Sequence, residues 1–114
     1  RPNIHINDMI GVYEHILSSD IEQGVYNAGF ENISILDLGN KIKNKVDCEI
    51  KIIESNDPRS YRQCSDKLIK TGFKQKFNID NAIDEISDAF YNKNLTDDDS
   101  CYTVKWMKDK VING

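Results

Sequence analysis

The sequence lacks several features on which common protein functions depend. Its 114 residues include only three cysteines, six glycines and two prolines. It contains no glycine-rich phosphate-binding loop and no Tyr-x-x-x-Lys pair, so chemistry that needs either must draw on residues outside this chain. No apolar run approaches the roughly 20 residues that a membrane-spanning helix requires. We therefore expect a soluble chain that forms the back half of a larger unit.

The cysteines exclude two further classes of protein. Cys48, Cys64 and Cys101 are widely spaced and form no C-x-x-C pattern. A secreted disulfide scaffold or a zinc site would require paired spacings. The sequence also shows no secretory signal. We therefore expect free thiols in a reducing cytoplasm, and no metal site.

Size and charge narrow the possibilities further. A chain of 114 residues fits a single domain, which buries roughly two-thirds of the surface of its unfolded chain. The 15 basic and 19 acidic residues give a net charge of −4, which argues against broad nucleic-acid binding because that needs a large basic surface. We expect one globular domain without a nucleic-acid or membrane partner.

Periodicity predicts a mixed α/β unit. Alternation of apolar and polar side chains favours short strands at 3–7, 25–28 and 49–53. Helical spacing favours helices at 9–17, 35–46, 66–71, 79–90 and 103–111. The helix at 103–111 is expected to turn Val104, Met107 and Val111 inward. These strands are too few to close a sheet of their own, which again suggests a missing half.

Capping residues are predicted at several helix ends. Asp8, Ser34 and Ser65 are good N-cap residues. Ser34 is followed three residues later by Asp37, which resembles a capping box with a shortened acid. Gly72 is expected to end the helix that begins after Ser65.

Arginine occurs in two segments, 1–8 and 57–62. The planar guanidinium group captures phosphate oxygens through two parallel hydrogen bonds, which a lysine cannot do. Two such segments in an acidic chain predict an anionic small molecule held between them. His5 and the acidic run 97–99 are interpreted as structural and solvated, respectively.

Six short motifs follow one another along the chain. They are R-P-N-I-H-I-N-D at 1–8, Y-N-A-G at 26–29, S-I-L-D at 34–37, R-S-Y-R at 59–62, S-D-K at 65–67 and T-G-F-K at 71–74. In this order and spacing the chain resembles the C-terminal portion of the extended short-chain dehydrogenases/reductases, the NAD-dependent sugar-nucleotide epimerase/dehydratase family. Cys64 and Gln75 depart from the usual aspartate and proline, and 102–114 has no counterpart in the pattern.

The resemblance implies the fold and the activity. Residues 1–114 would be a single substrate-binding lobe of a Rossmann-type enzyme whose N-terminal dinucleotide-binding half is absent. Residues 1–29 would pack against the core of that missing half. The whole enzyme would use NAD or NADP on a nucleotide-sugar in polysaccharide biosynthesis. It could form a homo-oligomer. This chain would supply no catalytic residue, bind no cofactor alone and be inactive by itself.

The resemblance also implies a substrate site formed by Arg1, Asn3, Asp57, Arg59, Tyr61 and Arg62. Arg1 and Arg59 would hold the diphosphate from opposite sides, whereas Arg62 would point away if its segment is extended.

Each of these residues has a simpler interpretation. Arg1 could form a surface salt bridge, and Asp57 could be a turn residue rather than a ribose ligand. Tyr61 could line the nucleotide pocket or pack beneath its loop. Asn3 borders the entry strand and could contact the sugar or base. A different class also stays open, namely a stand-alone, non-catalytic nucleotide-binding or interaction module. A small regulatory protein without a ligand is a third possibility.

Overall fold

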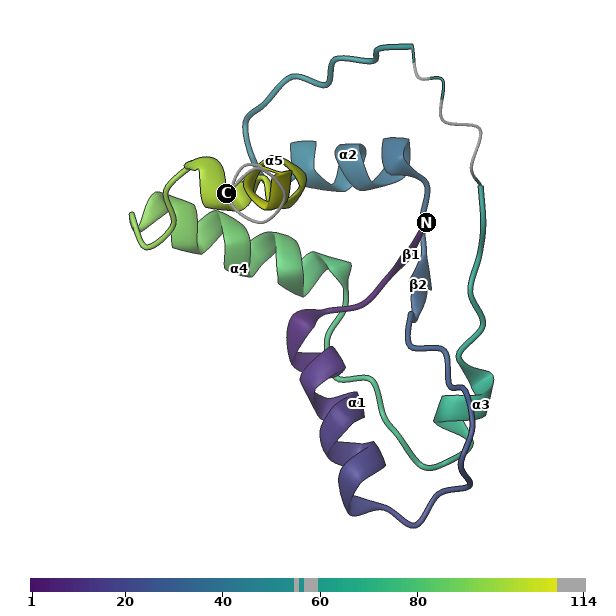
Figure 1. Cartoon of the computed structure of the whole chain (residues 1–114). Coiled ribbons are helices and arrows are strands. Elements are labelled where there is room, and N and C mark those ends of the chain that lie inside the picture. Colours follow the sequence, from purple (N-terminus) through teal and green to yellow (C-terminus); the bar gives the residue numbers. More distant parts are fainter. Residues whose placement is uncertain (55, 57–59, 109–114) are drawn as a thin grey trace.

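The computed structural model describes residues 1–54, 56 and 60–108. The elements in chain order are β1 (Pro2–Asn3), α1 (Ile6–Ser18), β2 (Glu31–Asn32), α2 (Ile35–Lys43), α3 (Asp66–Ile69), α4 (Ile79–Tyr91), the short 3-10 helix η1 (Asp99–Cys101) and α5 (Thr103–Met107). The part described is thus a small, helix-rich mixed unit around a two-stranded sheet, compatible with a small α/β fold (Figure 1).

The sheet consists of β1 and β2, which run antiparallel with Pro2 opposite Asn32. One further pair of residues extends it: the Arg1 main-chain nitrogen donates to the Ile33 oxygen (2.6 Å), and the Ile33 amide donates to the Arg1 oxygen (3.0 Å). The predicted first strand, 3–7, is therefore shifted toward the start of the chain, because α1 already begins at Ile6.

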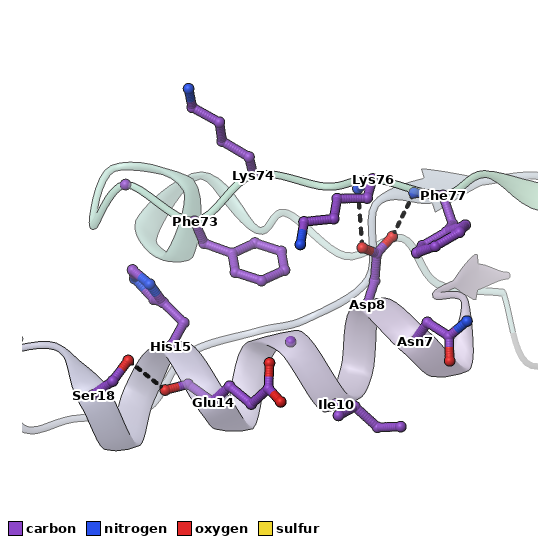
Figure 2. A pocket seen from close by; sticks show the side chains of 12 residues that line it. Asn7, Asp8, Ile10, Glu14, His15, Ser18, Phe73, Lys74, Lys76 and Phe77 are labelled. Carbon is purple, nitrogen blue, oxygen red and sulfur yellow. Dashed lines mark hydrogen bonds between the residues drawn. The ribbon is translucent and has the colours of Figure 1, made fainter.

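Helix α1 begins earlier than predicted. His5 is its N-cap, with Nδ1 accepting from the Asn7 amide (3.2 Å). The prediction of Asp8 as N-cap is wrong: Asp8 lies in the first turn, 2% exposed. Its carboxylate accepts from the backbone amides of Lys76 (2.9 Å) and Phe77 (3.0 Å), as Figure 2 shows. Asp8 therefore binds a distant segment to α1 instead of closing its own helix.

Two predicted strands are wrong. Residues 25–28 form no strand; instead the Lys67 ammonium donates to the Val25 oxygen (3.2 Å) and the Asn27 side chain donates to the Cys64 oxygen (3.3 Å). Hydrogen bonds with the α3 region thus take the place of a partner strand. Residues 49–53 also form no strand, because no other segment among the described residues pairs with them.

Of the four predicted caps, those at Ser34 and Gly72 are confirmed. The Ser34 hydroxyl accepts from the Asp37 amide (2.9 Å) and donates to its carboxylate (2.6 Å). Gly72 has φ +96°, a conformation that favours glycine after a helix. Ser65 precedes α3, but its hydroxyl exchanges bonds with the Gly29 amide (3.0 Å) and oxygen (2.9 Å) rather than capping.

The core is small and lies between α1 and α3. Val12, Leu68 and Phe73 form its buried centre. Phe30 stacks on Phe73 with ring centroids 5.6 Å apart. The core therefore lies beside the sheet and ties its second strand to both helices.

The C-terminal helix departs from the prediction. α5 ends at Met107, and both Met107 and Val104 are exposed rather than inward. Val111 lies outside the described residues.

Helices α2 and α4 lie side by side (Figure 1). Lys41 pairs with Asp80 (2.8 Å) and Lys45 with Asp84 (2.7 Å). Lys41 lies on α2 and Lys45 in the turn that follows it, and their partners are four residues apart in the same order on α4, so α2 and α4 run in the same direction. A mainly apolar cavity of about 220 Å³ lies between their facing sides and β1.

Two properties of the whole described chain bear on its class. All three cysteines are free thiols, as predicted. Within the described ranges, the helices are too short or too polar to cross a membrane.

Candidate functional site

The structure brings Arg1 and Tyr61 together, although sixty residues of chain separate them. The Arg1 guanidinium carbon lies 5.0 Å from the centroid of the Tyr61 ring. This distance is typical of a cation–π contact. The ring is 55% exposed, so Tyr61 does not pack beneath its loop but presents its surface beside a cation.

Side-chain hydrogen bonds fix the segment that carries Tyr61. The Asn32 side chain donates to the Gln63 oxygen (2.9 Å) and accepts from the Gln63 amide (2.9 Å). An amide side chain that bonds both main-chain groups of one residue replaces a strand neighbour. Because β1 and β2 are paired, this contact places the Tyr61 segment next to Arg1.

Asn3 has a structural position. Its side-chain nitrogen donates to the Arg1 oxygen (2.9 Å) and more weakly to the Glu31 oxygen (3.3 Å). Asn3 thereby holds the main chain of Arg1 in place. Its donors are directed at the two strands, so it positions the site rather than reaching out of it.

The remaining predicted site residues are less constrained. Arg62 is exposed, and within the described part of the chain its side chain forms neither a hydrogen bond nor an ion pair. Asp57 and Arg59 lie outside the described residues. The structure thus joins Arg1, Asn3 and Tyr61 in one place and leaves Arg62 on the adjoining surface.

This arrangement suits binding better than catalysis. A guanidinium group is a charge-assisted donor for phosphate oxygens, and an exposed ring offers a face to a planar base. Among the described residues, no group of three or more His, Cys, Asp or Glu side chains could hold a metal ion. The surface at Arg1 and Tyr61 is thus suited to bind an anionic, partly aromatic molecule.

A second concave region lies elsewhere and contains none of the predicted residues. It is a groove of about 610 Å³ between α1 and the segment 72–77. Figure 2 shows Lys76 extending toward α1 and Lys74 away from it, with the Glu14 side chain on the helix. The sequence signal for this groove is the segment F-K-Q-K-F at 73–77, in which two aromatic residues flank two lysines.

Both histidines have structural partners. His5 is buried, stacks on Phe77 (centroids 4.6 Å apart) and contacts the Glu85 carboxylate through Nε2 (3.2 Å). His15 bonds the Thr71 hydroxyl through Nε2 (2.8 Å). Neither lies in the Arg1–Tyr61 site.

Comparison of the chain with protein-family models, with curated proteins and with solved structures found no match.

Proposed function

We propose that this chain is the substrate-binding part of an NAD(P)-dependent nucleotide-sugar epimerase, dehydratase or reductase, and that it holds the nucleotide diphosphate. The observation that carries the proposal is the placement of Arg1 over the Tyr61 ring at the end of the β1–β2 pair. Both residues belong to the motifs on which the family resemblance rests. They come from the two arginine segments that the sequence predicts on either side of an anion.

The outer surface of α1 supports the part of the proposal that concerns a larger enzyme. Ile6, Ile10, Tyr13 and Leu17 follow one another at intervals of four, three and four residues, and Leu17 is 86% exposed. This spacing places apolar side chains along one side of a helix, where another element normally covers them. In the proposed enzyme, the dinucleotide-binding half covers this side.

In such an enzyme the chain binds and orients. The nicotinamide cofactor, held by the other half, accepts and returns a hydride at the sugar ring. Arg1 would offer charge-assisted hydrogen bonds to the diphosphate, and Tyr61 would fix the direction of its guanidinium group. Holding the diphosphate at one point places the sugar for reaction, which is a contribution of positioning rather than of acid–base chemistry.

The test is calorimetric titration of the 114-residue chain with UDP, GDP, CDP, dTDP and inorganic pyrophosphate. We expect saturable binding of at least one nucleoside diphosphate. Arg1→Ala should weaken it by about tenfold to a hundredfold, because a hydrogen bond to a charged group contributes about 1.5–3 kcal/mol. Arg59→Ala tests the sequence-based assignment of the second arginine in the same way.

Matched variants separate the site from general charge. Lys70→Ala removes an exposed cation next to α3 and should leave binding unchanged. Tyr61→Phe retains the ring under Arg1 and should bind as the parent does, whereas Tyr61→Ala should not. If a folded chain binds none of the nucleotides, or if Lys70→Ala weakens binding as much as Arg1→Ala, the diphosphate site is wrong. The non-catalytic interaction module would then be favoured.

A further inference from the structure

The segment 46–53 has the properties of a β-strand that lacks a partner. Exposure alternates over its first part, because Val46, Cys48 and Ile50 are half-buried and Asp47 and Glu49 are exposed, whereas all of 51–53 is exposed. A period of two residues indicates an extended chain with two faces. Nevertheless, among the described residues no backbone hydrogen bond involves 47–54.

The position of this segment leaves its edges open. One face lies against α2, since Ile50 Cδ1 is 3.6 Å from the point that a Cβ on Gly39 would occupy. Figure 1 shows the chain after α2 arching away from the β1–β2 sheet, at the opposite end of the molecule from α1. An extended segment with unpaired amides and carbonyls, and with no proline at 46–54 to block pairing, is a template for another strand.

The charges of the segment identify its partner. In an antiparallel pair of identical strands centred on Ile50, Glu49 of each copy lies opposite Lys51 of the other, so both cross-strand charge pairs are attractive. On the other face Ile50 meets its own counterpart, and Cys48 lies opposite Ile52. Unlike charges and apolar pairs directly opposite one another stabilise a sheet.

Neighbouring registers are less favourable. A pair centred on Lys51 places Lys51 opposite itself, and a pair centred on Glu49 places Glu49 opposite itself. Like charges directly opposite are destabilising. A shift by one residue would set Ile50 against Lys51 and mix the two faces. Of these registers, the one centred on Ile50 avoids these conflicts.

We propose that the residues Asp47–Ile53 form the interface with a second copy of this chain, as an antiparallel strand pair centred on Ile50. This interface is separate from the outer side of α1, and it does not depend on the proposed enzymatic function. The pair would be short, and isolated two-stranded pairing is marginal in water. The packing of Ile50 against α2 in each copy would supply the additional apolar contact.

Analytical ultracentrifugation over a range of concentrations tests the proposal. The chain should show a reversible monomer–dimer equilibrium. Glu49→Lys or Lys51→Glu should each raise the dimer dissociation constant by about tenfold, because each change turns two attractive cross-strand pairs repulsive. The double exchange Glu49→Lys/Lys51→Glu restores both pairs and should return the constant to within about threefold of the parent.

The charge exchange distinguishes this interface from dimerisation through α1. A dimer that ignores both single changes but dissociates with Leu17→Ser would use α1 and would overturn the proposal. A chain that stays monomeric at every concentration would overturn it as well. Because all the changed side chains are exposed, circular dichroism should show each variant folded as the parent is.

Cross-linking fixes the register independently. In a Cys64→Ser/Cys101→Ser background, Ile52→Cys places a new thiol opposite Cys48 of the second copy, at a separation that a disulfide spans. Mild oxidation should yield a covalent dimer. Ile53→Cys is the matched control on the opposite face, and it should yield little. Equal cross-linking by both variants would contradict the register.

Discussion

Helices α1 and α2 are both amphipathic, but different kinds of contact hold them in place. The inner side of α1 contributes Val12 to the core, and the buried Asp8 carboxylate on the same side binds two backbone amides. α2 has no fully buried residue, and the exposed pairs of Lys41 and Lys45 with α4 secure it. Surface ion pairs contribute little to stability, whereas buried apolar and hydrogen-bonded groups contribute much. We infer that the α1–α3 region is the stable part of the unit and that α2 is the more easily detached.

Among the variants that test this difference in stability, Leu68→Ala should have the largest effect. Leu68 is 0% exposed and packs with Val12 and Phe73 beneath α1. Its truncation should lower the free energy of unfolding by about 2–5 kcal/mol. Urea unfolding followed by circular dichroism measures this change.

Leu17→Ala is the matched control for Leu68→Ala. It is the same truncation on the outer side of α1, and it should change the free energy of unfolding by no more than about 0.5 kcal/mol. A large loss for Leu17→Ala would show that the outer side of α1 is already covered in solution, either by a second copy or by another segment.

Asp8→Asn should have an intermediate effect. The substitution keeps the shape but replaces one acceptor oxygen with a donor, so that the amide of Lys76 or of Phe77 loses its partner. An unsatisfied buried group of this kind costs about 1–3 kcal/mol.

Glu14→Gln is the matched change for Asp8→Asn on the same helix. The Glu14 carboxylate is exposed and, within the described structure, accepts no hydrogen bond from the protein. We expect its replacement to be nearly neutral in the same unfolding experiment. Equal effects of the two variants would mean that the Asp8 contact does not stabilise the link between α1 and 72–77.

The helices could be predicted because their signals lie within a few residues of one another. The strands could not, because they depend on contacts between distant segments. The apolar spacing of 79–90 and the cap at Ser34 each act within a few residues, and the structure contains both features. Strands need partners, and the sequence does not state which segment pairs with which. The alternation at 49–53 is real, but no other segment among those described pairs with it.

The same distinction applies to the candidate site. Arginine chemistry identified Arg1 as an anion-binding residue from the sequence alone. Its contact with Tyr61 depends on a bond between the Asn32 side chain and the Gln63 backbone, and no local pattern announces such a bond. Asp8 illustrates the reverse error. A residue type that favours N-caps was placed at a cap, whereas burial and two distant amides determined its actual role.

The smallest expected effect is on the ion pair between Lys45 and Asp84, and a pH titration measures it. The hydrogen bond to Asp84, together with the negative charges of Asp84 and Asp80, raises the pKa of Lys45 above its ordinary value. A raised lysine pKa means that the pair stabilises the fold below the ordinary lysine pKa and ceases to do so as pH rises through the folded-state value. Asp84→Asn should therefore lower the pKa of Lys45, measured by NMR titration of the lysine side chains, whereas Asp88→Asn, one turn farther along α4, should leave it unchanged. An unchanged Lys45 pKa in Asp84→Asn would show that the Lys45–Asp84 pair does not hold α2 against α4.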